Sequence, residues 1–178
     1  MTLQDIMMKR RSVRSYTGEQ IPQETLESIL KAGLLAPSSR GQKPCVFYAV
    51  RNKTVLKKLS EAKKAGGAML KDADTAIVVT ASGTKADTWI EDCSIALTYM
   101  DLAAAEAGIG SCWVQMHLRR DANDSDAEEN VRKILHLEND MRIAGILSLG
   151  IPAKMPPAHT EREIADSPVH IIAGEEDL

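Results

Sequence analysis

Residues 87–107, DTWIEDCSIALTYMDLAAAEA, give the clearest indication of how this chain folds. Apolar residues occur on almost every side of the corresponding helical wheel, and such a helix needs to be covered on most of its surface. Residues 108–116, GIGSCWVQM, leave the helix through two glycines and continue with the composition of a β-strand. We therefore predict a long buried helix at the centre of the molecule, followed directly by a strand.

Hydrophobic patterns elsewhere predict the elements that cover this helix. The continuous apolar run DTAIVVTAS, residues 74–82, is typical of an interior strand that is covered on both faces. Apolar and polar spacing predicts further strands at 45–50 and 141–150, and helices at 2–9, 22–33, 53–64 and 131–137. Strands and helices are mixed along the chain, which indicates an α+β fold.

Two segments are expected to lie outside regular structure. APSSRGQKP, residues 36–44, is rich in turn-forming residues and is predicted to be a loop. The tail from residue 151 contains four of the seven prolines, so we predict that it is extended rather than helical. No repeat or change of composition divides the chain, and we interpret residues 1–178 as a single domain.

The overall composition argues against several classes of protein. The chain has 22 Lys and Arg against 25 Asp and Glu, so its net charge of −3 creates no general attraction for nucleic acid or anionic membranes. The longest apolar stretches, 76–81 and 143–151, are far shorter than the ~20 residues that a membrane span requires. Three cysteines without CxxC spacing, and a start unlike a signal peptide, predict a protein of the reducing cytoplasm.

The segment KRRSVRSY, residues 9–16, is the sharpest local candidate for a binding site. Arginine provides a forked and permanently charged set of donors, and a serine hydroxyl adds another hydrogen bond, so this combination suits a phosphate group. The alternative is that these cations follow a helix C-terminus and stabilise its dipole. Both interpretations stay open when the segment is considered alone.

Two other segments allow a binding interpretation beside a structural one. The loop 36–44 offers two hydroxyls and two cations between prolines, which fits either a small polar pocket or an ordinary turn. Gly108 and Gly110 allow a flat ligand to approach the backbone closely, but they also suit the end of a helix. They are no dinucleotide fingerprint, because a third glycine is missing and the motif follows a helix instead of opening one.

The residue patterns of common catalytic machinery are missing from the sequence. The four histidines are scattered without an HExxH pattern, so we expect no metal site, and no G-x-S-x-G motif is present. The three cysteines are interpreted as small core residues. No side chain of this protein is therefore predicted to be catalytic.

Three motifs in order resemble the nitroreductase family of FMN-dependent oxidoreductases. They are Arg10-Arg11-Ser12-x-Arg14, then Ala36-Pro37-Ser38-Ser39, and finally Gly108-x-Gly110-Ser111-Cys112-Trp113 after the long helix. The tail, from Gly150 through Arg162 to His170, is also similar to the family's C-terminal stretch. The resemblance covers nearly the whole chain.

The resemblance implies an α+β fold in which helices flank a mixed, mainly antiparallel sheet with a long buried central helix. It also implies an intertwined homodimer with FMN at the interface between the subunits. The tail 151–178 would then wrap the partner subunit. The implied cofactor-binding residues are Arg10, Arg11, Ser12, Arg14, Pro37, Ser38, Ser39, Gly41, Gly108, Gly110, Ser111 and Arg162.

The family pattern assigns a different part of the flavin to each motif. The first motif would hold the ribityl phosphate, with Arg11 at the polar edge of the flavin. The 37–39 loop would reach the flavin from the partner subunit, and the backbone of 108–111 would lie against the isoalloxazine. Either Lys154 or Arg162 would complete the phosphate site.

The implied reaction is a ping-pong cycle in which NAD(P)H delivers hydride to N5 of FMN and leaves before an acceptor such as a nitroaromatic or quinone binds. A flavin carries the hydride itself, which agrees with the lack of catalytic side chains. Gly41, Lys43 and Cys45 replace the family's usual Asn, Gln and Trp, and Lys154 replaces a common acidic residue. These departures leave two alternatives. One is a non-catalytic protein, such as a sensor or storage protein, that binds FMN or another phosphate ligand. The other is a specialised reductase, for example of flavins.

Overall fold

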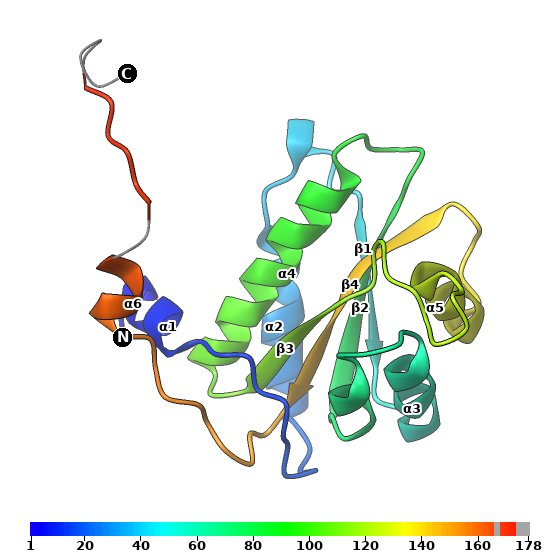
Figure 1. The fold of residues 1–178 in the computed structure, drawn as a ribbon, viewed down its shortest axis with the longest axis horizontal. Helices are drawn as coiled ribbons and strands as arrows, with labels where there is room; N and C mark the ends of the chain where they lie inside the picture. Colours follow the sequence, from blue (N-terminus) through cyan, green and yellow to red (C-terminus); the bar gives the residue numbers. More distant parts are fainter. Residues whose placement is uncertain (166–167, 174–178) are drawn as a thin grey trace.

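The computed structural model describes residues 1–165 and 168–173, and it places helices on both faces of a four-stranded sheet (Figure 1). The strands are β1 (Cys45–Val50), β2 (Thr75–Ser82), β3 (Gly110–Gln115) and β4 (Met141–Gly150). Their order in the sheet is β1-β2-β4-β3, and every neighbouring pair is antiparallel. The resemblance implied a mixed, mainly antiparallel sheet, and the four strands are antiparallel throughout. Among the described residues, parallel pairing occurs at an isolated bridge between Ser12 and Ser111.

Strand β2 explains why both faces of the sheet are covered. All eight of its residues are buried, and successive side chains point to opposite faces. Ile77, Val79 and Ala81 belong to one apolar core with helices α2 (Gln23–Leu35) and α4 (Trp89–Glu106). Ala76 and Val78 belong to a second core with α3 (Lys53–Glu61) and α5 (Ala127–Leu135). The prediction of an interior, doubly covered strand is confirmed.

The helix boundaries follow from local capping. In α1 (Leu3–Lys9), Thr2 and Asp5 form a reciprocal capping box, which confirms the predicted start. Helix α5 begins four residues earlier than predicted because the Asp126 side chain accepts a hydrogen bond from the amide of Glu129. Helix α2 extends two residues beyond its predicted end, whereas α3 stops three residues short. Among the described residues, no helix combines the length and apolar character needed to cross a membrane.

Helix α4 is buried on the side that faces the sheet, where residues such as Cys93, Leu97 and Met100 enter the first core. Its other side is uncovered in the single chain, and Tyr99 is 41% exposed. Together with α1, this side forms an apolar groove of about 450 Å³. We call it the α1–α4 groove, and its lining residues are Leu3, Ile6, Met7, Thr98, Tyr99, Leu102, Ala103 and Glu106. The predicted burial of the long helix therefore holds for its sheet side.

The prediction of a wholly extended tail is wrong at Glu161–Ala165, which forms the short helix α6. The prolines of the tail stand before and after this segment, so its own backbone is free to turn, and His159 bonds Glu163 one turn away. Helix α6 lies beside α1, and the amide of His159 donates to the carbonyl oxygen of Met8 at 2.8 Å (Figure 1). Residues 166–167 and 174–178 of the predicted tail lie outside the described part. The loop 36–44 likewise contains one 3-10 turn, Ser39–Gly41.

Candidate functional site

The basic segment that follows α1 is fixed as a strap between β3 and the chain that leaves β4. The amide of Val13 donates to the carbonyl oxygen of Ser111 at 2.8 Å, and the amide of Thr17 donates to that of Ile151 at 2.9 Å. Val13 is 2% exposed and lies so close to Gly110 that a Cβ there would be 2.8 Å from its Cγ1. Gly110 is therefore needed for the close approach of the strap, residues 10–17.

The strap carries Arg10, Ser12 and Arg14 past β3, where Ser12 pairs with Ser111, the neighbour of Cys112. Burial raises the pKa of the Cys112 thiol, while both guanidinium groups and a hydrogen bond with the Ser12 side chain oppose that rise. Arg14 also lines an open hollow of about 410 Å³ together with Lys154 and the two prolines 156 and 157. We call Arg10, Ser12, Arg14 and Lys154 the basic cluster. Its members come from the end of α1 and from the start of the tail.

A carboxyl group on α4, Asp101, faces the basic cluster. It accepts a hydrogen bond of 2.5 Å from the Ser111 hydroxyl, and it lies 3.5 Å from a guanidinium nitrogen of Arg10. Burial raises the pKa of Asp101, although the Ser111 hydrogen bond and Arg10 act in the opposite direction. Sequence reasoning missed this residue, and its signal was an acidic side chain between the apolar residues Met100 and Leu102 of the long helix.

Arg11 reaches toward the tail, where Pro157 also lines the hollow that Arg14 borders. Its guanidinium donates to the carbonyl oxygen of Pro157 at 3.1 Å and lies 3.9 Å from the carboxylate of Glu163 on α6. Arg162 is an exposed residue of the same short helix. Of the two residues predicted to complete a phosphate site, Lys154 thus shares the hollow with Arg14, and Arg162 lies on the helix that Arg11 holds.

The loop that carries Pro37, Ser38 and Ser39 is attached to the opposite end of α4. The amide of Ser39 donates to a carboxylate oxygen of Asp92 at 2.8 Å, and the amide of Lys43 donates to the Ser38 hydroxyl at 2.8 Å. Pro37 and Ser38 line a small pocket on this loop. A neighbouring residue, Gly41, has a φ of +67°, and a side chain there would meet open space.

Helix geometry separates this loop from the basic cluster within one chain. Asp92 and Asp101 are nine residues apart, which is two and a half helical turns and about 14 Å along the axis. The two carboxyl groups consequently point to opposite sides of α4. The structure therefore unites Arg10, Ser12 and Arg14 but does not bring the 37–39 loop of the same chain to them.

The glycine motif after α4 is only partly open to a ligand. Gly108 is exposed with a φ of +72°, and no atom lies within 4 Å of the position that a Cβ would take. Gly110 and Ser111 are buried beneath the strap, and the carbonyl oxygen of Ser111 already accepts from Val13. Contacts of these three residues with a cofactor stay predictions.

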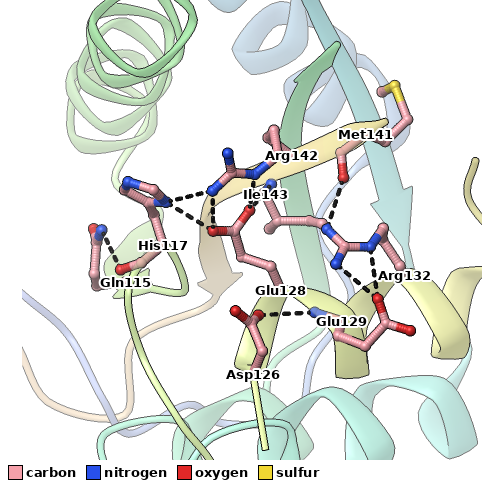
Figure 2. Close-up of polar contacts among 9 residues, drawn as sticks. All are labelled: Gln115, His117, Asp126, Glu128, Glu129, Arg132, Met141, Arg142 and Ile143. Atoms are coloured by element: carbon pink, nitrogen blue, oxygen red, sulfur yellow. Dashed lines mark hydrogen bonds and ion pairs between the residues drawn. The ribbon is translucent and has the colours of Figure 1, made fainter. Parts of the chain in front are cut away.

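A second ionic region surrounds Glu128 on the other face of the sheet (Figure 2). Glu128 is 2% exposed. Its carboxylate accepts hydrogen bonds from the Arg142 guanidinium at 2.9 Å and from the amide of Ile143 at 2.9 Å. It also lies 2.7 Å from Nδ1 of His117. The Arg142 guanidinium also stacks over the ring of Trp89, 4.8 Å from its centroid. We call Glu128, His117, Arg142, Ile143 and Trp89 the Glu128 network. Burial opposes ionisation, but the hydrogen bonds outweigh it and lower the pKa of Glu128 to about 2.

The Glu128 network was not found from the sequence because Glu128, His117 and Arg142 are eleven to twenty-five residues apart and form no known motif. The donors that face the Glu128 carboxylate are bonded to it within the protein, which suits a structural role rather than ligand binding. Across the described part of the chain, no group of three His, Cys, Asp or Glu side chains is placed to hold a metal ion.

Comparison with known proteins gives matches over most of the chain. The model of the nitroreductase family matches residues 7–67 and 61–151. A protein of Archaeoglobus fulgidus is 40% identical over 147 residues, which cover 80% of this chain and 81% of that relative. A protein of Methanothermobacter thermautotrophicus is 31% identical over 159 residues, covering 88% and 80% respectively. Both carry the provisional name NADH dehydrogenase/NAD(P)H nitroreductase.

Among solved structures, the chain is similar to an FMN-dependent nitroreductase from Clostridium difficile R20291. The two chains share 36% sequence identity and superimpose with a TM-score of 0.89, over 94% of this chain and 98% of that one. The similarity therefore extends beyond the sheet and the long helix to almost the whole described fold.

Proposed function

The chain belongs to the nitroreductase family, and from this premise we propose that it is an FMN-dependent oxidoreductase that takes hydride from NAD(P)H. We further propose a ping-pong cycle whose acceptor is an organic molecule such as a nitroaromatic or a quinone. Two archaeal relatives are named for NAD(P)H, and a solved relative is named for FMN, which supports this choice of donor and cofactor.

The observation that carries this proposal is the basic cluster. Arg10, Ser12 and Arg14 lie on one short strap, Lys154 shares a hollow with Arg14, and Asp101 is the carboxyl group that faces Arg10. These donors fit a phosphomonoester, because guanidinium groups pair with phosphate oxygens in a fork and each charge-assisted hydrogen bond contributes about 1.5–3 kcal/mol. The strap is held by backbone hydrogen bonds to β3, so the donors are positioned before a phosphate arrives.

The residues of this chain bind and orient rather than react. When bound, FMN supplies reversible hydride chemistry, and the protein around it supplies position and electrostatics. Arg10 and Arg14 would hold the phosphate end, and Arg14 lines the open hollow, which leaves that end accessible from solvent. The backbone at Gly108 is exposed, and a flat ring system would extend from the phosphate end toward it.

We propose that a second copy of the chain completes the site. The 37–39 loop lies at the far end of α4 and on its opposite side, so a cofactor held by Arg10 would meet this loop from a partner. The uncovered α1–α4 groove supplies an apolar surface for such a partner. The tail supplies another, since it exposes Val169, Ile171 and Ile172. A homodimer would cover these surfaces, with the tail 151–178 lying over the other subunit.

Cofactor content and reduction test the proposal. The purified protein is expected to be yellow and to contain about one FMN per chain, measured after denaturation releases the cofactor. Anaerobic addition of NADH or NADPH should then bleach the flavin, and addition of a quinone or nitroaromatic should restore the colour. A colourless protein that takes up no FMN would overturn the proposal.

The same experiment distinguishes the two alternatives. A binding protein without turnover would hold FMN that neither nucleotide bleaches. A specialised flavin reductase would show faster NAD(P)H oxidation with free FMN than with a quinone. Lys43 and Cys45, which depart from the family pattern, line the pocket of the 36–44 loop. We therefore expect these two residues to change which acceptor the protein prefers.

A further inference from the structure

Cys45 and Cys93 place their sulfur atoms 3.6 Å apart, although they are 48 residues apart in the sequence. Cys45 is the first residue of β1, and Cys93 lies in the N-terminal half of α4. We propose that these two cysteines form a redox-active dithiol that a hydroperoxide oxidises to an intramolecular disulfide. The proposal concerns a site separate from the basic cluster and does not depend on the flavin.

The geometry favours this pairing over other thiol reactions of the protein. A disulfide has a sulfur–sulfur distance of about 2.05 Å, so the two sulfur atoms need to approach by about 1.5 Å. Rotation of the partly exposed Cys45 side chain can contribute to this approach. The third cysteine, Cys112, lies on β3 with its sulfur near the carbonyl oxygen of Trp113, and no second thiol stands at that place.

The environments of the two thiols assign them different steps. Cys45 is partly exposed and lines the pocket of the 36–44 loop beside Lys43, so a small oxidant can reach its sulfur. Cys93 is 0% exposed and can act only on a neighbouring atom. A hydrogen bond with the Cys93 thiol lowers the pKa of Cys45, whereas the same contact and burial raise the pKa of Cys93. Its exposure and its lowered pKa therefore make Cys45 the thiol that reacts first with the oxidant.

The reaction balances with one hydroperoxide for each disulfide. The Cys45 thiolate attacks an oxygen of hydrogen peroxide, an S–O bond forms, the O–O bond breaks, and hydroxide leaves and takes up a proton. Cys93 then attacks the sulfur of the resulting sulfenic acid, an S–S bond forms, and the second oxygen leaves as water. Two thiols supply two electrons and two protons, and the peroxide becomes two molecules of water.

The disulfide would act on the loop that carries four of the predicted cofactor contacts, Pro37, Ser38, Ser39 and Gly41. Cys45 directly follows the 36–44 loop, and Asp92, the neighbour of Cys93, accepts the hydrogen bond from Ser39. Oxidation would thus tie both ends of this loop to α4. In a reducing compartment such a bond is transient, as expected of a redox-sensing pair rather than a structural disulfide.

Thiol counting on the full-length protein tests the proposal. The reduced protein is freed of reductant, treated with a stoichiometric amount of hydrogen peroxide and denatured in acid, and its remaining thiols are then titrated. We expect the count to fall from three to one, and the intact mass to decrease by two hydrogen atoms. Peptide mapping without reduction should recover Cys45 joined to Cys93. Three persisting thiols, a bridge to Cys112 or a bridge between two chains would each overturn the proposal.

Single substitutions distinguish the two steps. In Cys93→Ala, oxidation should stop at a sulfenic acid on Cys45, which dimedone traps, whereas Cys45→Ser should yield no dimedone adduct and no disulfide. Cys112→Ala is the matched control and should still form the bridge. Peptide mapping of the unsubstituted protein decides the matter even where a variant fails to fold, because it requires no substitution.

Discussion

Cations outnumber carboxyl groups around Arg10 and Arg14, whereas one carboxylate is enclosed by donors in the Glu128 network (Figure 2). Both regions lie beside the same sheet and both use arginine. In the basic cluster Arg14 and Lys154 border an open hollow, and in the Glu128 network the guanidinium of Arg142 is stacked on Trp89.

The opposite pKa shifts of two carboxyl groups express this difference. Burial dominates at Asp101 and raises its pKa, because Ser111 and Arg10 compensate only partly. At Glu128 the hydrogen bonds prevail and lower the pKa to about 2. A region whose charges are satisfied internally stabilises the fold, and a region that retains surplus positive charge at an open surface is suited to bind an anion.

Removing both guanidinium groups of the basic cluster should have the largest effect. We expect the double variant Arg10→Ala/Arg14→Ala to weaken FMN binding by about 4 kcal/mol, roughly a thousandfold, since at least two charge-assisted hydrogen bonds are lost. Titration of the apoprotein with FMN, followed by quenching of flavin fluorescence, measures the affinity. Arg120→Ala removes an exposed cation that pairs with Asp124 and serves as the control. Unchanged FMN affinity in the double variant would show that the phosphate site lies elsewhere.

Loss of the charge at Glu128 should act on stability instead of binding. We expect Glu128→Gln to lower the free energy of unfolding by about 3 kcal/mol, because Arg142 and His117 lose the anion that they surround. Urea denaturation measures this difference, and the FMN affinity of the folded variant should stay within about twofold of the original. A large loss of affinity with unchanged stability would reverse the roles given to the two regions.

The pH dependence of stability should distinguish the two regions further. The folded pKa of Glu128 is about 2, below its ordinary value of 4.5, so its contribution is fully present above 4.5 and is lost as the pH falls toward 2. Between pH 7 and pH 3 we expect a loss of about 2 kcal/mol that is attributable to this residue. The measurement is the stability gap between the original protein and Glu128→Gln at both pH values. A gap that stays constant would contradict the assignment.

Neutralising Asp101 should have the smallest effect of these substitutions, and it should strengthen FMN binding instead of weakening it. Asp101→Asn keeps a hydrogen-bond partner for Ser111 but releases Arg10 from its competing carboxyl group. We expect FMN to bind more tightly by about 1 kcal/mol, or roughly fivefold, as for a partly exposed ion pair. The same fluorescence titration measures it, with Asp124→Asn as the control on a remote exposed carboxylate. Weaker binding in Asp101→Asn would show that this carboxyl group supports the site instead of competing with it.

Several features of the fold could be predicted because they depend on local sequence. The apolar run of β2, the long α4 and the capping box at Thr2 arise from side chains that are neighbours in the chain. The short helix α6 was missed because the surrounding prolines favour extended structure, whereas the contact between His159 and Glu163 favours a turn. Such competing local preferences are decided by packing against the rest of the molecule.

Long-range contacts explain the features that were not predicted. Arg10 and Asp101 are 91 residues apart, and Glu128 meets Arg142 only because α5 packs on the end of β4. The proximity of Cys45 and Cys93 likewise depends on how α4 crosses β1. No periodicity or spacing in the sequence encodes these pairs.

Local sequence specifies most of the helices and strands, the interior position of β2 and the three motifs that resemble the nitroreductase family, because hydrophobic periodicity and short motifs are local properties. Tertiary packing places Arg10 beside Asp101, puts Arg14 and Lys154 in one hollow, and attaches the 37–39 loop to the other end of α4. It also decided which ionic groups are satisfied and which remain open to a ligand. The physical reason is that burial and charge pairing are properties of neighbours in space, and folding chooses those neighbours from distant parts of the chain.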